Sequence, residues 1–401
     1  MDSKYMLSWI AGLLCSFSCL AAPLTPNERE ITQQRQAELL ELNEQQRLSL
    51  QRSTSVDSRV SSSSAPGGNC IRINTIILTG ASHLPTDVER KIYADWQHRC
   101  LFLRDLFQLR DTISAWYLNA GFITSQAFIL PQDLAGGSLT VTVIEGKRQE
   151  VRVNQQQNPA INAIFPRHPD GLLNLWDIEQ GLEQINRVRR QSATIDILPA
   201  DTQAGSVVNL VMPAEFPLIF NISAENSGQK STCEDRLNGR VQANNLLGIA
   251  DQWYMAGGGC NGMSAHTGDS RSFQSGVSLV YGYWSGDYSY SWSDYLSPFR
   301  QQSFDWRYHG SSEYHQLRLS RILQRDGDGK SGLSLALARQ KNSNYLNTLR
   351  LAGSSYSLTS FSTQLSHSQK WLAGYGTLNV SWQRGLPFSD CLLYTSPSPR
   401  D

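Results

Sequence analysis

The spacing of hydrophobic residues changes near Pro217 and divides the chain into two regions. After Pro217, apolar or aromatic residues alternate with Ser, Asn, Gln and Gly, as in residues 288–292 and 333–337. Because successive side chains of a strand point to opposite faces, an alternation of period two predicts β-strands. The turn signals between these segments predict about nine strands before Asp390.

The two faces of these strands differ in chemistry. One face is apolar and aromatic, and the other carries small polar residues with few charges. A soluble β-sandwich, which is the alternative, would bury its apolar face and place charge outside. Uncharged polar faces and aromatic residues near strand ends are typical of a transmembrane barrel with a water-filled lumen. We therefore expect an antiparallel transmembrane β-barrel over residues 217–390.

The region before Pro217 contains two consecutive units of similar pattern, over residues 69–147 and 148–216. Each unit is expected to fold as β-α-α-β-β, so that the two form an α+β repeat. In the first unit the pattern predicts strands at 70–78, 123–130 and 139–144, and helices at 85–96 and 101–120. In the second it predicts strands at 148–153, 193–198 and 207–212, and a helical region that ends in 178–188.

The N-terminal segment precedes these units. Residues 1–22 have the apolar run and small-residue exit of a secretory signal peptide, so we expect export to an oxidising compartment. Thr25, Pro26 and Glu28 form a capping box, which predicts a helix within residues 23–52. Its apolar stripe is thin, so it is expected to lie in a polar channel or to stay apart from any core. Residues 53–68 are expected to be a Ser/Gly linker.

The C-terminal residues 391–401 read CLLYTSPSPRD, which resembles a translated sequencing-library adapter. We expect the natural protein to continue differently after Asp390.

Composition narrows the classes of function. The chain has 401 residues with 35 basic and 35 acidic side chains, and this balance argues against nucleic-acid binding through phosphate contacts. Only 17% of its residues are charged, against about 25% in ordinary soluble domains. After the signal segment, no apolar run approaches the ~20 residues that a membrane-spanning helix requires.

No motif points to an enzyme, a cofactor or a bound nucleotide. The seven histidines lack the spacing of metal ligands, and residues 326–331 fit neither a calcium loop nor a phosphate loop. This segment is expected to be a hairpin turn. The cluster Asn186, Arg187, Arg189 and Arg190 is either a docking patch or a set of cations favoured by a helix C-terminus.

Seven cysteines occur, of which Cys15 and Cys19 lie in the signal segment and Cys391 in the C-terminal segment. The other four are Cys70, Cys100, Cys233 and Cys260. An even number in an exported protein predicts two disulfides, with metal ligation as the alternative.

Several motifs occur in a specific order along the two units and the entry to the predicted barrel. They lie at residues 70–80, 116–124, 130–134, 145–146, 177–187, 225–232, 281–284 and 324–326. Together they resemble the two-partner secretion outer-membrane transporters, the TpsB family of the haemolysin-activator and filamentous-haemagglutinin-exporter type (ShlB/FhaC/HecB). Cys233 stands where that family usually has Gly.

The resemblance implies two periplasmic POTRA domains, a plug helix over residues 25–52 and a barrel of about sixteen strands, of which about nine are present. The POTRA domains would capture an unfolded secreted exoprotein and pass it through a pore in the lipid of a Gram-negative outer membrane, without ATP. Two other functions remain as alternatives: an outer-membrane protein assembly factor of the same superfamily, and a passive porin or adhesin barrel.

The POTRA interpretation suggests where an extended exoprotein binds. An exposed edge strand can accept a further strand from another chain. The expected docking edge is Ile123, Thr124, Ser125, Gln126, Ala127 and Phe128, beside a groove formed by Trp116 and Tyr117. In the simpler alternative these two aromatic residues belong to the core. A proline at Ser125 or Gln126 is expected to remove one edge donor without unfolding the domain.

The same interpretation pairs the cysteines. Cys70 and Cys100 would join the first strand of the first POTRA domain to the start of its second helix. With periplasmic POTRA domains, Cys233 and Cys260 would both lie in extracellular loops, where they could approach within the ~4.4–6.8 Å that a disulfide requires.

Overall fold

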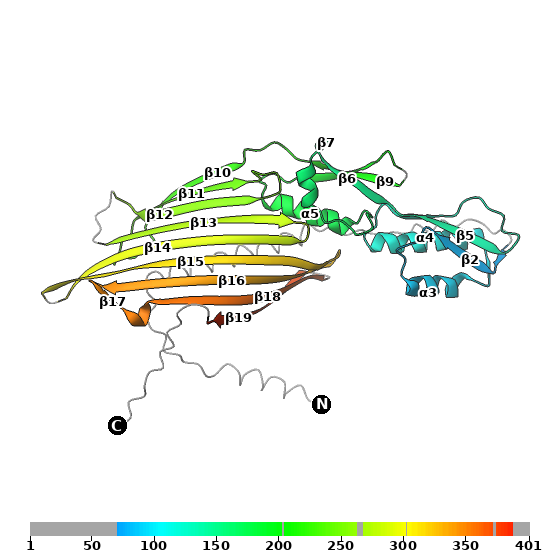
Figure 1. The fold of residues 1–401 in the computed structure, drawn as a ribbon. Coiled ribbons are helices and arrows are strands. Elements are labelled where there is room, and N and C mark those ends of the chain that lie inside the picture. The colour runs from blue at the N-terminus through cyan, green and yellow to red at the C-terminus, as the bar shows by residue number, and fades with distance from the viewer. Residues whose placement is uncertain (1–69, 203, 263–267, 302, 372–373, 388–401) are drawn as a thin grey trace, which may run out of the picture.

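The computed structural model describes residues 70–387, except 203, 263–267, 302 and 372–373. Figure 1 shows a long antiparallel sheet, with two smaller α/β units following one another beyond one end of its strands. The expected signal peptide, the helix capped by Thr25, Pro26 and Glu28, the linker and residues 391–401 lie outside the described residues.

The first unit contains two helices and five strands. They are β1 (Ile71–Ile73), β2 (Thr75–Thr79), α3 (Thr86–Trp96), β3 (Arg99–Leu101), α4 (Leu103–Asn119), β4 (Gln126–Phe128) and β5 (Ser138–Ile144). Its main sheet has the order β2-β5-β4, in which β2 runs parallel to β5 and β4 antiparallel to it. The core lies between this sheet and the helices, where Leu109, Ile113 and Tyr117 of α4 are fully buried. Their spacing of four places all three on one face of the helix.

Two expected strands of this unit are wrong in extent. The strand predicted over residues 70–78 is divided, because the N–H groups of Asn74 and Thr75 both donate to the carbonyl of Gly137. The part before this bend, β1, pairs with β3 instead of with the main sheet. The strand predicted over residues 123–130 is reduced to β4, because Ser125 N–H donates to Phe122 O in a turn.

The second unit repeats the arrangement with one helix fewer than expected. It contains β6 (Lys147–Val153), β7 (Gln156–Gln157), a 3₁₀ helix (Pro159–Ala163), α5 (Leu175–Arg187), β8 (Thr194–Pro199) and β9 (Gly205–Val211), and its sheet has the order β7-β6-β9-β8. The prediction of two α-helices here is wrong. Pro166 and Pro169 prevent a long helix from following Pro159, since proline lacks the N–H that an internal helical turn needs.

The third part is a large antiparallel sheet. Its strands are β10 (Leu218–Glu225), β11 (Arg236–Asn244), β12 (Gln252–Cys260), β13 (Asp269–Tyr281), β14 (Trp284–Gln301), β15 (Phe304–Arg325), β16 (Gly329–Leu346), β17 (Leu349–Arg350), β18 (Tyr356–Trp371) and β19 (Gly374–Leu386). Each long strand pairs with the next long strand in the chain, and the two-residue β17 pairs with β16 alone. The succession of strands within the described part of the chain confirms the expected antiparallel architecture.

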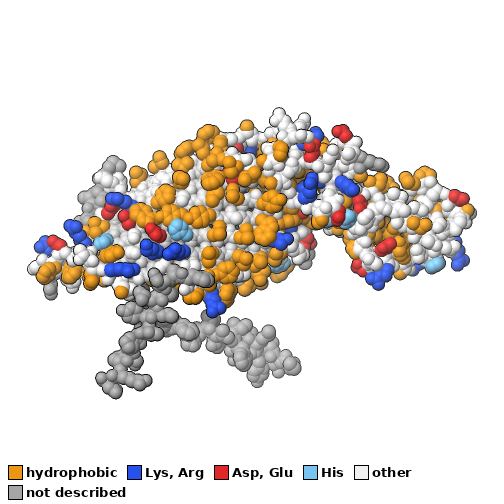
Figure 2. Space-filling view, viewed as in Figure 1, with side chains coloured by type: hydrophobic (Ala, Val, Ile, Leu, Met, Phe, Trp, Pro, Cys, Tyr) orange, Lys and Arg blue, Asp and Glu red, His pale blue; other side chains and the backbone are white. Residues whose placement is uncertain are grey.

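The register of this sheet separates apolar from polar side chains. One row of directly paired residues crosses six strands and is apolar or aromatic: Trp253, Val277, Tyr288, Leu317, Leu337 and Phe361. The adjacent row points to the other face and is mostly small or polar: Tyr254, Gly276, Ser289, Gln316, Ala338 and Ser360. The apolar face is open, since Leu317 is 58% exposed and Leu337 47% exposed. Figure 2 shows the resulting band of hydrophobic side chains across the sheet.

Candidate functional site

The expected docking edge of the first unit lies on β4, which is an edge strand because β5 is its one neighbour in the order β2-β5-β4. Gln126 and Phe128 are exposed, whereas Ala127 is buried. Ile123 and Thr124 lie outside the edge. Ile123 packs against the hydrophobic core of the second unit, and Thr124 lies against Gly146.

The backbone donors of this edge are already in use. Ala127 N–H donates to Ser114 Oγ of α4 at 3.0 Å. Since successive N–H groups of a strand point to opposite sides, the N–H of Gln126 points toward β5. Ser125 is 3% exposed, and its Oγ accepts a bond from Gly146 N–H. The expectation that a proline at Ser125 or Gln126 removes an idle edge donor is therefore wrong.

The two aromatic residues expected to form a groove differ in position. Tyr117 is fully buried, and its hydroxyl donates to Glu145 Oε1 at 2.8 Å. Burial and this bond to Glu145 raise the pKa of the Tyr117 phenol. Trp116 is half-buried against the core, with its ring edge-on to Tyr117. The alternative that these aromatic residues belong to the core agrees with their positions.

Other apolar side chains are exposed beside β4. Phe107 of α4 is 45% exposed, Phe128 38% and Leu130 59%. Phe107 precedes Ser114 by seven residues, which places both on the face of α4 that meets β4. Phe107 was expected on the apolar face of this helix and not beside the docking edge, although its spacing from Ser114 would have indicated that position once the α4–β4 contact was known.

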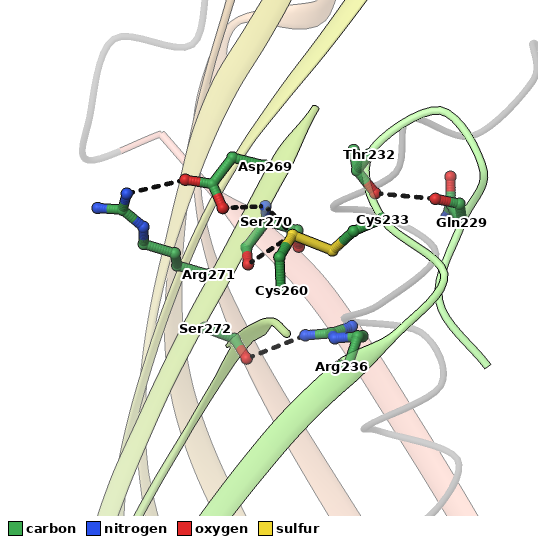
Figure 3. Close-up of a disulfide and its surroundings, with 9 residues drawn as sticks. All are labelled: Gln229, Thr232, Cys233, Arg236, Cys260, Asp269, Ser270, Arg271 and Ser272. Carbon is green, nitrogen blue, oxygen red and sulfur yellow. Dashed lines mark hydrogen bonds and ion pairs between the residues drawn. A yellow bond between two sulfur atoms is a disulfide. The ribbon is translucent and has the colours of Figure 1, made fainter. Parts of the chain in front are cut away.

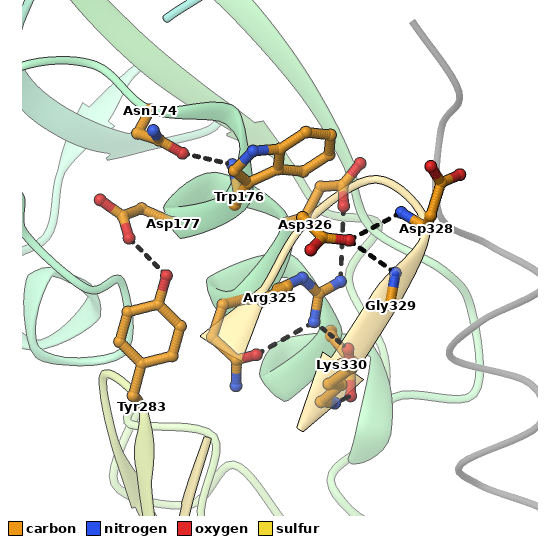
Figure 4. A network of polar contacts seen from close by, with 12 residues as sticks. Asn174, Trp176, Asp177, Tyr283, Arg325, Asp326, Asp328, Gly329 and Lys330 are labelled. Carbon is orange, nitrogen blue, oxygen red and sulfur yellow. Dashed lines mark hydrogen bonds and ion pairs between the residues drawn. The ribbon is translucent and has the colours of Figure 1, made fainter. Parts of the chain in front are cut away.

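A second group of contacts joins α5 to the turns at one end of the large sheet. Tyr283, between β13 and β14, donates its hydroxyl to Asp177 Oδ1 at 2.6 Å. Arg325, at the end of β15, donates to Gln180 Oε1 at 3.0 Å and to Glu183 Oε2 at 2.5 Å. Figure 4 shows Asp177 facing Tyr283, and Arg325 lying between the helix and the turns.

Glu183 has a second cationic partner, Lys330 Nζ at 2.5 Å from Oε1. Burial alone raises the pKa of Glu183, but the charges of Lys330 and Arg325 outweigh burial and lower the pKa to about 2. The side chains of Arg325 and Glu183 are only 7% and 26% exposed. This ion pair is therefore poorly screened by solvent.

Trp176 links all three parts of the structure. A Cβ atom added at Gly121 in the first unit would lie 2.7 Å from Trp176 Nε1, and one added at Gly327 would lie 3.0 Å from its Cη2. Gly327 belongs to the turn between β15 and β16, which confirms the hairpin expected at residues 326–331. Both glycines therefore allow a close approach of backbone to the indole ring.

The cluster that begins at Asn186 is not a free docking patch. Asn186 exchanges hydrogen bonds with the backbone of Ala193. Arg187 donates to Ser278 Oγ and to Ala250 O in the large sheet region. Arg189 pairs with Glu215 and donates to Pro213 O, and Arg190 N–H donates to Glu215. Of these contacts, those of Arg187 join the second unit to the large sheet region, and the others lie within the second unit or between it and residues 213–215.

Both expected disulfides are present. Cys70 bonds to Cys100 with a Cα–Cα distance of 5.3 Å. The bond connects the start of β1 to β3 and not to the start of the second helix as expected, because Cys100 pairs with Arg72 in the β1–β3 ladder. Cys233 bonds to Cys260 with a Cα–Cα distance of 5.8 Å. Figure 3 shows the second bond joining the β10–β11 loop to the end of β12. This end of the sheet is opposite the turns that contact α5.

Among the described residues, no helix is both long and apolar enough to span a membrane.

Comparison with known proteins covers all three parts of the chain. The family model described as haemolysin secretion/activation protein ShlB/FhaC/HecB matches residues 204–394. A ShlB-type POTRA domain model matches residues 71–146, and a further POTRA domain model matches residues 147–199.

Curated relatives include outer membrane transporters. CdiB of Escherichia coli is 42% identical over 94% of this chain and 64% of its own length. CdiB of Dickeya dadantii is 39% identical over 94% of this chain and 68% of its own length. The hemolysin transporter protein ShlB of Serratia marcescens is 26% identical over 80% of this chain and 57% of its own length. The chain thus spans 64% of the length of the first of these relatives.

Solved structures agree in fold. The structure of CdiB from Escherichia coli matches with a TM-score of 0.86 and 42% identity, over 92% of this chain and 69% of that one. CdiB from Acinetobacter baumannii matches with a TM-score of 0.69 and 20% identity, over 89% of this chain and 70% of that one, which supports the fold alone. From its domains, its identity to these relatives and its fold, the chain belongs to the haemolysin secretion/activation protein family ShlB/FhaC/HecB.

Proposed function

We propose that the chain forms part of an outer-membrane pore that exports an unfolded exoprotein captured by its two periplasmic POTRA units. The observation that carries this proposal is the two-faced sheet with POTRA units attached at one end of its strands (Figures 1 and 2). An open apolar face suits contact with lipid, and a small polar face suits a water-filled lumen. The relatives named as transporters agree with this function.

The contacts of the second unit support one direction for the proposed pore. The turns that hold α5, around Tyr283 and Asp326, lie at the POTRA end of the strands. A periplasmic location of the POTRA units therefore places the Cys233–Cys260 bond on the extracellular side. The resemblance to the family implies that transport proceeds without ATP, and nothing in the proposed capture step needs catalysis.

Capture is assigned to the edge of β4 and the apolar side chains beside it. An incoming extended segment would accept a hydrogen bond from Ala127 N–H in place of Ser114 Oγ. Its apolar side chains would cover Phe107, Phe128 and Leu130, which are 38–59% exposed. Backbone bonds supply affinity with little demand on sequence, while the apolar side chains select hydrophobic segments.

Export tests the proposal directly. In the native bacterium, deletion of the gene should remove from the medium a large β-helical protein encoded beside it. A Phe128→Lys variant should insert into the outer membrane normally but weaken docking by about 5- to 30-fold, which corresponds to about 1–2 kcal/mol of lost apolar contact. Export should fall accordingly.

The matched control is Ile77→Lys on β2, at the opposite edge of the same sheet, where Ile77 is 45% exposed. It should export normally. Normal export by both variants would show that β4 is not the docking edge. Secretion of the neighbouring gene product without the transporter would instead contradict the pore function itself.

A further inference from the structure

Three metal-ligating side chains meet where the first POTRA unit contacts the second. His83 lies in the segment between β2 and α3, whereas His168 and Asp170 lie between the 3₁₀ helix and α5. His83 Nε2 is 2.8 Å from Asp170 Oδ2, and His168 Nδ1 is 3.8 Å from the same oxygen. All three ligand atoms lie within 4.8 Å of one another. Two domains therefore contribute to one cluster.

A second layer of contacts orients His83. Its Nδ1 lies 2.9 Å from Glu145 Oε2, and Glu145 also accepts bonds from His83 N–H and the Tyr117 hydroxyl. When Nδ1–H donates to Glu145, the lone pair of Nε2 faces Asp170. A carboxylate bound to the far nitrogen of a histidine is the usual outer partner of a metal-binding imidazole, because it fixes the tautomer and the ring orientation.

His168 supplies an independent indication. Its Nδ1 is buried and has no hydrogen-bond partner among the described residues. Phe122 packs edge-on against the His168 ring with centroids 5.7 Å apart, and the two histidine rings are also 5.7 Å apart. A buried nitrogen without a hydrogen-bond partner destabilises the fold, because it has lost its contact with water and gained nothing in return. A ligand that binds this nitrogen would remove this destabilisation.

A proton is the competing occupant of the cluster. Burial lowers the pKa of His83, but its bonds to Asp170 and Glu145 outweigh burial and raise the pKa above its ordinary value. A protonated His83 would satisfy both carboxylates. It would leave His168 Nδ1 without a hydrogen-bond partner, since Asp170 Oδ2 at 3.8 Å is too far to accept a hydrogen bond from it and carries no proton to donate. A cation between the three atoms satisfies all of them.

We propose that His83 Nε2, His168 Nδ1 and Asp170 Oδ2 form a site for a divalent transition metal of the Zn²⁺ type that joins the two POTRA units. Two imidazole nitrogens and one carboxylate oxygen suit Zn²⁺, whose bonds of about 2.0–2.2 Å place its ligands roughly 3.4 Å apart. Asp170 is 59% exposed, so a fourth position is open to water. The site is independent of the proposed transport function.

Metal binding by the purified chain in detergent tests the site. After removal of the affinity tag and of bound metal with a chelator, calorimetry at neutral pH should show one tightly bound Zn²⁺ per chain. Co²⁺ in place of Zn²⁺ should give the d–d absorption of a low-coordinate site with nitrogen ligands. The amides of Leu173 and Leu175, which donate across the junction to Gly146 and Gly121, should exchange more slowly when Zn²⁺ is present.

Variants separate this site from adventitious binding. His168→Gln and Asp170→Asn each remove one ligand, and each should weaken Zn²⁺ binding by more than about 100-fold. Glu145→Gln should weaken it by about 10- to 100-fold, as expected of an outer partner. His98→Asn is the matched control, because His98 is an exposed histidine of the same unit with a positive φ of 58° that Asn tolerates.

The exposed position of Asp170 keeps the test independent of folding, since Asp170→Asn removes a ligand without disturbing the core. Absence of saturable Zn²⁺ binding to the parent chain would overturn the proposal. Binding that is equal in the parent, His168→Gln and Asp170→Asn would overturn it as well.

Discussion

Replacement of Glu183 by glutamine should loosen the contact between α5 and the large sheet. Glu183 accepts from Arg325 and Lys330, each at 2.5 Å. Glutamine has the same shape but no charge. The substitution Glu183→Gln therefore leaves the 7% exposed Arg325 side chain with Gln180 and Glu179 as its remaining strong partners.

The expected loss of stability depends on the partners that Arg325 keeps. Removal of one partner from a buried ion pair costs about 3–5 kcal/mol when nothing replaces it. Because Arg325 keeps the Gln180 carbonyl at 3.0 Å and the Glu179 carboxylate at 3.5 Å, we expect a smaller loss. A loss of about 2–3 kcal/mol corresponds to opening that is about 30- to 160-fold more frequent.

Hydrogen exchange of the α5 amides, read by mass spectrometry on the purified chain, measures this opening. The amides of Leu175–Arg187 should exchange about 30- to 160-fold faster in Glu183→Gln, while those of α4 stay unchanged. Asp196→Asn, which neutralises an exposed carboxylate on β8, is the control and should leave α5 unaffected. Exchange of α5 within about twofold of the parent chain would refute a stabilising role for the pair.

Three further results are expected. The low pKa of Glu183 favours its charged form when α5 is in contact with the sheet. The contribution of Glu183 to the stability of this contact should therefore be complete above about pH 4.5 and decline as the pH falls toward 2. Hydrogen exchange of α5 at several pH values would detect this decline. Leu317→Arg should destabilise the sheet in lipid by about 2–4 kcal/mol and Gln316→Arg much less, since these neighbours point to opposite faces; equal losses in lipid-bilayer unfolding experiments would contradict the assignment of the faces. On intact cells, a membrane-impermeant thiol reagent should label Cys233 and Cys260 only after reduction, and labelling before reduction would show that the bond is absent in the cell.

Features of the fold that depend on residues close together in the sequence could be predicted, whereas features that depend on distant residues could not. The alternation at residues 333–337 predicted a strand correctly, because side chains two residues apart share a face whatever their partners. The division of β1 from β2 was missed, because it depends on the carbonyl of Gly137, more than sixty residues away in the sequence. One helix too many was predicted in the second unit, because it was expected to repeat the two helices of the first unit although Pro166 and Pro169 disfavour a helix there.

The functional residues likewise differ in whether nearby or distant parts of the sequence determine their contacts. The four cysteines were identified from their number and placement, and their pairing agrees with the structure. Tyr117 was placed in a groove because its spacing marks an apolar helix face, but spacing alone does not separate the buried part of that face from its border. The ion pair of Glu183 with Arg325 joins residues 142 positions apart, and no local pattern indicates it.

The position of Trp176 has a mechanical consequence. Its indole touches Gly121 on one side and Gly327 on the other, so it transmits force between the first POTRA unit and the β15–β16 turn. A push of the first unit toward the turn is thus carried by contact through an aromatic ring as well as through the connecting backbone. Because the ring is rigid, displacement of the first unit toward the turn is expected to displace the turn as well.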